Sequence, residues 1–247
     1  MLIHSDRFLP GDIDVWRERS RIDQITASSP RLARKEEVAL DVIRRFFASG
    51  MGYVGTSWGK DSVVATHLAW RALGNQVPIV WVIAEPHRNP DCFDVRDAFL
   101  GRFGVRYDEI IVHAEITDGE WTPFREIEKR GFGEACKRYG DRHVSGVRAD
   151  ESGIRKIVMK RWGHSTDRTC RPIGWWSGDE VFGYLHKYDL PIHPAYAMSR
   201  EGLDDRARLR VAWLGGDRGR GFNRGEIEDT YYRDEIERVA RLLEEAR

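Results

Sequence analysis

The residues best suited to phosphate chemistry lie together in one hexapeptide, Ser57-Trp58-Gly59-Lys60-Asp61-Ser62. A turn of this composition between a strand and a helix leaves backbone N–H groups unpaired, and these bind phosphate oxygens with help from the helix dipole. Lys60 can add a mobile positive charge. Asp61 would repel a phosphate unless it binds Mg²⁺ or caps the helix, and we expect a Mg²⁺ ligand or a cap here. The spacing differs from a Walker loop, which needs GxxxxGK followed by Ser or Thr.

A second segment suited to anions begins at Gly146 and runs through Ser152. Arg148 follows a predicted strand and can clamp a phosphate or sulfate with two parallel hydrogen bonds. Glu151 is expected to orient an arginine or cap the next helix, and Ser152 can donate a hydrogen bond to an anion. Arg155 lies four residues after Glu151, so anion binding and a structural ion pair are both open for it.

The three cysteines, Cys92, Cys136 and Cys170, are widely spaced and form no CxxC pair. This pattern is typical of incidental thiols in a reducing cytoplasm. It also lacks the Cys-Cys and CxxC sets of iron–sulfur proteins, so we expect no iron–sulfur cluster. Arg168 and Arg171 flank Cys170 and would lower the pKa of an exposed thiol there, which keeps a reactive Cys170 as a minor alternative.

The elements that must position these residues follow from the apolar pattern. Apolar residues recur at helical spacing from Leu32 to Phe47, just after Pro30, and predict a helix there. Tyr53–Thr56 is predicted to be a short strand that leads into the hexapeptide. The β-branched run Ile79–Ile83 is typical of a central strand. The other expected elements are, in order, helices opening at Asp61-Ser62 and covering 91–103, a strand at Tyr107–Val112, a helix at Phe124–Tyr139, a strand at 143–146, a helix from Ser177 and a helix over Glu226–Arg247.

This alternation predicts an α/β fold with a doubly wound, mostly parallel sheet, helices on both faces and a helical C-terminal extension. Ligands of such sheets bind beyond the carboxyl ends of the strands, and both candidate loops directly follow a strand. We therefore expect one nucleotide site, with adenine flanked by Ile79–Ile83 and Ala84-Glu85. The expected organisation is an N-terminal arm over residues 1–30, a nucleotide-binding domain over 31–196, and an Arg/Gly-rich loop with a C-terminal helix over 197–247.

The 40 basic and 40 acidic side chains of this 247-residue chain cancel, so no global field draws it to a polyanion. The loop over 199–225 is nevertheless rich in arginine, and it could bind a polyanion or be balanced by its own aspartates. The arginines are Arg206, Arg208, Arg210, Arg218, Arg220 and Arg224, and the aspartates are Asp204, Asp205 and Asp217. No apolar run approaches the roughly 20 residues of a membrane span, and the first residues lack an apolar signal-peptide centre. A cytoplasmic protein without membrane contact is expected.

The hexapeptide at 57–62 resembles the SGGKDS signature of the PP-loop (N-type) ATP pyrophosphatases, the adenine nucleotide alpha hydrolase superfamily. Trp58 stands where that signature has glycine; it narrows the allowed backbone angles, or it stacks on a ligand ring. The phosphoadenosine phosphosulfate (PAPS) reductase-like branch is the most similar over residues 35–196. The further matching stretches are Asn89-Pro90-Asp91, the segment from Gly146 to Arg155, and the segment from Arg171 to Tyr196.

The resemblance implies an adenine nucleotide, ATP or PAPS, with Ser57–Ser62, Gly146, Arg148, Glu151, Ser152 and Arg155 around it. PAPS reductases that use thioredoxin carry a nucleophilic cysteine near their C-terminus, and this chain has none after Cys170. We therefore expect Lys60, Asp61 and Arg148 to cleave ATP between its α and β phosphates, with Mg²⁺ on Asp61, and to adenylylate an acceptor. The expected acceptor is nucleic acid or a sulfur carrier. PAPS reduction through Cys170 and a non-catalytic nucleotide-binding subunit are the alternatives, and the resemblance also implies a homodimer.

Overall fold

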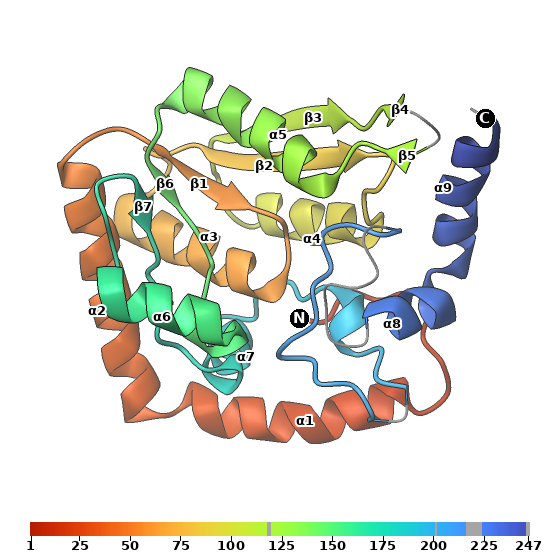
Figure 1. Ribbon diagram of the computed structural model, residues 1–247. Helices are drawn as coiled ribbons and strands as arrows, with labels where there is room; N and C mark the ends of the chain where they lie inside the picture. The colour runs from red at the N-terminus through yellow and green to blue at the C-terminus, as the bar shows by residue number, and fades with distance from the viewer. Residues whose placement is uncertain (118–119, 201, 216–223, 246–247) are drawn as a thin grey trace.

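The computed structural model describes residues 1–117, 120–200, 202–215 and 224–245. At its centre lies a five-stranded sheet in the order β3-β2-β1-β6-β7, and every neighbouring pair is parallel (Figure 1). The strands are β1 (Tyr53–Thr56), β2 (Ile79–Glu85), β3 (Tyr107–His113), β6 (His143–Val144) and β7 (Thr169–Cys170). The predicted α/β fold with a parallel sheet is confirmed. The strand order changes direction between β1 and β6, and this is the position where such sheets bind ligands.

Helices cover both faces of the sheet, as the sequence predicts. The helices α2 (Pro30–Ala48), α3 (Lys60–Leu73) and α4 (Asp91–Leu100) pack on one face, and α5 (Phe124–Tyr139) packs on the other (Figure 1). The larger core therefore lies under three helices, while α5 alone covers the opposite face of β2 and β3. Tyr53 of β1 also belongs to the smaller core on this face, where its ring lies 6.3 Å from that of Tyr139 in α5.

Strand β2 shows how the sequence specifies these two layers. Ile79, Trp81 and Ile83 belong to the core beneath α2, α3 and α4. Val80 and Val82 belong to the smaller core beneath α5. Successive side chains of a strand point to opposite faces, so an apolar run without alternation is what a strand buried on both faces requires.

Residues 1–30 differ from the expected irregular arm, because they contain the helix α1 (Asp12–Ala27). Its buried side chains are two acids, Asp12 and Asp23, so the segment lacks the apolar periodicity that identifies a helix in sequence. Asp12 accepts hydrogen bonds from the Ser199 hydroxyl and the Tyr231 hydroxyl, at 3.3 and 3.0 Å. These contacts hold α1 to the C-terminal part of the chain.

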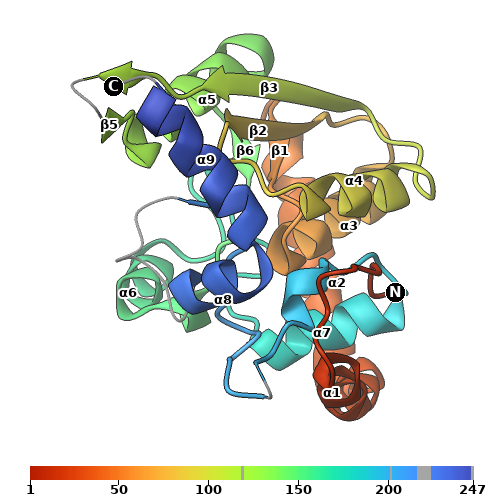
Figure 2. The ribbon, with the colours of Figure 1, turned by 90° about the vertical axis from the view of Figure 1, so that its right-hand side faces the viewer.

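The C-terminal extension is helical, but it consists of two helices, α8 (Arg224–Tyr231) and α9 (Arg233–Glu245), where the sequence predicts one. The helices are separated by Tyr232, which is buried and whose hydroxyl donates to the Asp91 carboxylate at 2.8 Å. Both helices lie beside the end of the sheet toward which the strands point (Figure 2). Burial of one aromatic side chain thus breaks a charged helical segment.

The remaining elements connect the sheet to its surroundings. They are the hairpin of β4 (Ile116–Thr117) and β5 (Glu120–Trp121), the 3₁₀ turn η1 (Ala149–Glu151), α6 (Gly153–Trp162), α7 (Gly178–Lys187) and the 3₁₀ turn η2 (Pro194–Tyr196). Among the described helices, none has the length and apolar character that a membrane crossing requires. The helix α7 begins just after Ser177, as the sequence predicts, and Ser177 and Glu180 form a capping box at its start.

Candidate functional site

A cavity of about 1080 Å³ lies at the carboxyl ends of β1 and β6, where the strand order changes direction. Both predicted loops line it. The hexapeptide contributes Ser57, Gly59, Asp61 and Ser62, and the segment after β6 contributes Ser145, Gly146, Val147, Glu151 and Arg155. The structure therefore brings the two segments together at one site.

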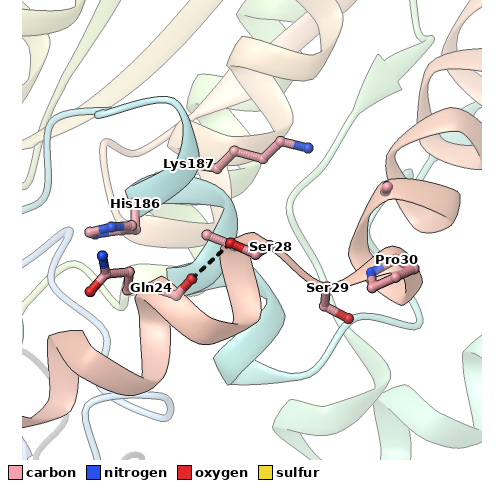
Figure 3. Close-up of a pocket in the computed structure, with 8 residues that line it drawn as sticks. Gln24, Ser28, Ser29, Pro30, His186 and Lys187 are labelled. Carbon is pink, nitrogen blue, oxygen red and sulfur yellow. Dashed lines mark hydrogen bonds between the residues drawn. The ribbon is translucent and has the colours of Figure 1, made fainter.

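A second hollow lies where α1 joins α2, beside the end of α7, and is lined by Gln24, Ser28, Ser29, Pro30, His186 and Lys187 (Figure 3). The Lys187 amine there is already paired with Glu36 at 2.7 Å. Neither of the predicted loops contributes to this hollow, so we place the functional site in the larger cavity.

The phosphate loop is held in shape by its own polar groups. Helix α3 begins at Lys60, and the first N–H groups of a helix have no partner within it. The Ser57 N–H donates to the Ser62 hydroxyl at 3.1 Å, and that hydroxyl donates to the Gly59 carbonyl at 2.9 Å. Asp61 and Ser62, in this first turn, line the cavity. The start of α3 thus offers an anion the amide groups and the dipole of a helix.

Gly146 allows the two loops to approach each other closely. A Cβ atom at this position would lie 2.8 Å from the carbonyl carbon and oxygen of Asp61, and 3.0 Å from the Ser62 nitrogen. These are backbone atoms, which cannot move aside as a flexible side chain could. The requirement for glycine here is therefore steric, and it explains the glycine that opens the predicted anion-binding segment.

Lys60, Asp61 and Arg148 form a linked group of charges beside the loop. The Lys60 amine lies 2.9 Å from one carboxylate oxygen of Asp61, and the Arg148 Nε lies 2.6 Å from the other. Burial alone would raise the pKa of Asp61, but the charges and hydrogen bonds of Lys60 and Arg148 outweigh it and hold that pKa below its usual value. Asp61 is therefore ionised at neutral pH.

Arg148 is not placed as the sequence suggested. Its side chain is 1% exposed and does not line the cavity, so it is not an anion clamp in this structure. Besides Asp61, its guanidinium donates to the carbonyls of Trp176 and Ala207, each at 3.2 Å. A guanidinium whose donors are satisfied within the protein is a structural group. The prediction of a phosphate or sulfate contact for Arg148 is corrected accordingly.

The expected Mg²⁺ ligand does not fit this arrangement either. Both carboxylate oxygens of Asp61 are taken by cationic side chains. Among the residues that the structure describes, no group of three or more His, Cys, Asp or Glu side chains is arranged to hold a metal ion. Mg²⁺ is usually held by one or two carboxylates together with substrate phosphates and waters, and the carboxylate of Asp61 is instead paired with two cationic side chains.

Trp58 lies in the core and not in the cavity, so it is unavailable for stacking on a ligand. It is fully buried, and its ring lies 5.5 Å from that of Phe99 and 5.7 Å from that of Tyr107. Its φ of 57° lies in the left-handed region that favours glycine. The position where the SGGKDS signature has glycine therefore has a backbone conformation that favours glycine, although the residue here is a tryptophan.

Trp58→Gly is expected to destabilise the protein, even though it restores the residue that the signature has. Relief of a left-handed backbone is worth about 1–2 kcal/mol, while removal of a buried tryptophan side chain costs about 3–5 kcal/mol. The free energy of unfolding should therefore fall by roughly 1–4 kcal/mol in urea denaturation. An unchanged or increased free energy would show that the tryptophan ring contributes little to the core.

The other residues of the second segment have local roles. The Glu151 carboxylate accepts from the Arg148 N–H at 2.8 Å and pairs with Arg155. The Ser152 hydroxyl caps α6, accepting from the Arg155 N–H at 3.2 Å, and does not line the cavity. Arg155 both pairs with Glu151 and lines the cavity, so the ion pair does not remove it from the site.

Sequence reasoning missed Tyr196 as a site residue. Tyr196 lines the cavity, and its hydroxyl accepts a hydrogen bond from the Lys60 N–H at 3.0 Å. The Lys60 amine also lies 5.1 Å from the centre of the Tyr196 ring. The His-Pro-Ala-Tyr sequence was the available signal, but it carried no indication of a partner 136 positions away. The preceding His193 is the hydrogen-bonded turn residue, accepting from the Ala195 N–H at 3.2 Å.

The arginines of the loop over 199–225 have different roles in the structure. Arg206 is buried, pairs with Asp23 at 2.5 Å and lies 3.9 Å from the Phe182 ring centre, so it holds α1 and α7 together. Arg208 lies 3.6 Å from Asp205, whereas Arg210 lines the cavity. Arg218 and Arg220 lie outside the described residues, as does the side chain of Arg224.

A parallel sheet with the hexapeptide loop between β1 and α3, at the point where the strand order changes direction, places the protein in the PP-loop class of α/β folds. The sequence profile of the phosphoadenosine phosphosulfate reductase domain matches residues 53–203, and the chain belongs to this family.

Two solved structures are similar to this chain. NMN synthetase from Francisella tularensis aligns with a TM-score of 0.49 and 13% identity, over 83% of this chain and 95% of its own. The U34-tRNA thiolase NcsA from Methanococcus maripaludis aligns with a TM-score of 0.43 and 16% identity, over 94% and 80%. No curated protein matches the sequence.

The cysteine spacing led us to expect no iron–sulfur cluster in this protein. One of the similar structures contradicts that expectation. The thiolase structure contains a [4Fe-4S] cluster. The expectation rested on three scattered cysteines in one chain, and a spacing rule does not exclude a cluster whose ligands come together only in the folded protein. The exclusion is therefore withdrawn.

Proposed function

We propose that the protein binds ATP and cleaves it between the α and β phosphates, transferring the adenylyl group to an acceptor and releasing pyrophosphate. The observation that carries the proposal is the start of α3, where first-turn N–H groups without helical partners and the Ser62 hydroxyl meet a cavity large enough for a nucleotide. Membership in the PAPS reductase domain family supports an adenine nucleotide as the ligand.

In the proposed reaction the acceptor's nucleophilic atom bonds to the α-phosphorus. The bond between that phosphorus and the bridging oxygen breaks, pyrophosphate leaves with the electron pair, and the acceptor proton passes to solvent. Lys60 and Arg148 supply two positive charges against the one negative charge of Asp61. This net positive charge lies beside the start of α3, and together with the amides of α3 it would stabilise the negative charge of a pyrophosphate leaving there. Arg148 acts as a positioning residue, because it holds Asp61, which in turn orients Lys60.

The experiment pairs pyrophosphate release from ATP with calorimetric binding of a non-cleavable α,β-methylene ATP analogue. Lys60→Met is expected to weaken analogue binding by about 10–100-fold and to abolish pyrophosphate release, because it removes a positive charge beside the start of α3 and leaves Asp61 with one cationic partner. Lys137→Met, at an exposed lysine of α5, serves as the matched control. Analogue binding that is unaffected by Lys60→Met would refute the proposed site. Tight binding without any pyrophosphate would favour a non-catalytic nucleotide-binding subunit.

PAPS reduction through Cys170 is disfavoured by the position of that thiol. Cys170 is fully buried in β7. Burial raises the pKa of its thiol to about 12, because desolvation outweighs the positive charges of Arg171 and Arg142. The sequence suggested the opposite shift from the neighbouring arginines, and desolvation is the reason that suggestion is wrong. A nucleophilic thiol requires exposure and a lowered pKa.

Alkylation with iodoacetamide provides a direct check on Cys170. At pH 8, a thiol with a pKa of about 12 is ionised in about one molecule in 10,000, and Cys170 should remain unmodified in the native protein. Cys136, which is partly exposed, is expected to react first. Peptide mass spectrometry after a timed reaction measures both residues. Modification of Cys170 ahead of Cys136 would return PAPS reduction to consideration.

A further inference from the structure

Helix α6 presents apolar side chains to solvent instead of to the core. Ile154 is 77% exposed, Ile157 is 67% exposed and Trp162 is 51% exposed. Ile154 and Ile157 are three positions apart, so they lie on the same side of the helix, and Trp162 is the last residue of the helix. An exposed apolar ridge on a short helix is a mark of an interaction surface.

The same helix carries positive charge without any compensating acid. Its sequence, Gly153–Trp162, contains no Asp or Glu. Arg155 pairs with Glu151 just before the helix, but Lys156, Lys160 and Arg161 are exposed and form no ion pair with the described residues. In a chain with no net charge, three unpaired cations on ten residues are a local positive patch.

The patch continues into the nucleotide cavity. Arg155 belongs to α6 and also lines the cavity, so α6 forms part of the cavity rim. The cavity wall formed by the start of α5 and residues 209–215 carries two more exposed arginines, Arg125 and Arg210, which form no ion pair with the described part of the chain. The Arg210 charge acts on Glu128 of α5, so these two segments lie close together.

Aromatic rings accompany these charges along the wall. Trp121, Phe132 and Trp213 line the cavity, and Phe132 is 42% exposed. At the other end of the positive surface, Arg161 lies 4.9 Å from the ring centre of Trp162. Cations for phosphates alternating with flat rings for bases are the two components of single-strand binding sites.

The cavity is at the upper end of the size range of small-ligand pockets. Pockets for small ligands measure about 300–1000 Å³, and this one reaches about 1080 Å³. A ligand bound at the phosphate loop therefore leaves space along the wall that contains Arg125 and Arg210. That space is where an acceptor would meet the α-phosphate.

From these observations we propose that α6 and the Arg125–Arg210 wall form one continuous track for a single-stranded nucleic acid, one nucleotide unit of which enters the cavity as the acceptor. The proposal rests on the proposed adenylyl transfer for the acceptor role, but not for binding. A second copy of this chain is a poor occupant of α6, because a two-fold contact would bring two sets of three unpaired cations together. A folded acidic protein could cover α6, yet it could not extend into the cavity. A flexible strand can do both.

The test is fluorescence anisotropy with labelled single-stranded RNA and DNA of about 12 nucleotides, the size range of such sites, measured without ATP over a series of salt concentrations. Each phosphate contact contributes about 0.7 to the slope of log affinity against log salt for single strands. Replacing Lys156, Lys160 and Arg161 together by Gln should reduce that slope by about 2 and weaken binding by roughly tenfold or more at about 0.1 M salt.

The matched control replaces three exposed arginines of α1 and α2, Arg21, Arg34 and Arg44, by Gln. Its slope should equal that of the unaltered protein. Equal weakening by both triple variants would show that the binding is non-specific and would overturn the track. Absence of oligonucleotide binding by the unaltered protein would also overturn it.

Substitutions of Trp162 test the contribution of base stacking separately from that of charge. Trp162→Ala should weaken binding by about tenfold, as expected for loss of one base–aromatic stack, and Trp162→Phe should retain most of the affinity. Tighter binding of RNA than DNA would indicate 2′-hydroxyl contacts, and equal binding would indicate recognition of the backbone. Because binding is measured without ATP, a track that binds strands but yields no pyrophosphate would contradict adenylyl transfer alone. Pyrophosphate release without strand binding would contradict the track alone.

Discussion

Arg148→Met is expected to lower the free energy of unfolding by about 3 kcal/mol. The substitution keeps the aliphatic stem but removes the guanidinium that pairs with Asp61. It also leaves the carbonyls of Trp176 and Ala207 without their donor. Breaking a buried pair costs about 3–5 kcal/mol, and the lower end applies because Asp61 is 18% exposed and water can reach it.

Urea denaturation measures this effect against Arg45→Met, which removes an exposed pair with Asp41 and should change the free energy by at most about 1 kcal/mol. Arg148→Lys should recover only part of the loss, because an ammonium cannot reach acceptors on several sides at once as the guanidinium does. Equal stability of Arg148→Met and Arg45→Met would mean that Arg148 is free to bind an anion, as the sequence had suggested.

Gly146→Ala is expected to remove nucleotide binding while the protein remains folded. The added Cβ would overlap the backbone of Asp61 and Ser62, so the two loops must separate. Loss of several hydrogen bonds to a charged phosphate, each worth about 1.5–3 kcal/mol, corresponds to about 100-fold weaker binding or more. Titration calorimetry with the ATP analogue measures the affinity, and circular dichroism confirms folding.

Gly153→Ala is the control for this substitution, because a Cβ at Gly153 would meet no atom within 4 Å. Its affinity for the nucleotide should equal that of the unaltered protein. If Gly146→Ala binds the analogue as well as Gly153→Ala does, the nucleotide does not depend on the close contact between these loops.

The fold was accessible from sequence because its pattern is local. The strands at 53–56 and 79–83 are apolar without alternation of apolar and polar residues, and each is followed by a segment with apolar residues at helical spacing. This pattern specifies a parallel sheet covered on both faces. The same reasoning missed α1, whose buried contacts are made by Asp12 and Asp23 and not by apolar residues. It also merged α8 and α9, because the residue that separates them is defined by a distant partner, Asp91.

For the site, the residue types predicted which two segments lie together, but they did not predict which groups their side chains contact. Arg148 and an anion, Asp61 and Mg²⁺, and Trp58 and a ligand ring were each chemically reasonable pairs. In the structure Arg148 and Asp61 instead satisfy each other, and Trp58 packs in the core. Whether a charged side chain faces a ligand or a neighbour depends on contacts between distant residues, which no local pattern contains.

The hydrogen bond between Lys60 and the Tyr196 hydroxyl, and the ion pair between Asp61 and Arg148, span 136 and 87 positions of the chain. During synthesis, the phosphate loop therefore leaves the ribosome long before Arg148 and Tyr196, whose contacts add to the hydrogen bonds within the loop itself. A nascent chain that ends before η2 contains the whole hexapeptide but not the support for its backbone. The proposed ability to bind a nucleotide would thus be acquired late, after the residues up to Tyr196 have been made and have folded onto the sheet.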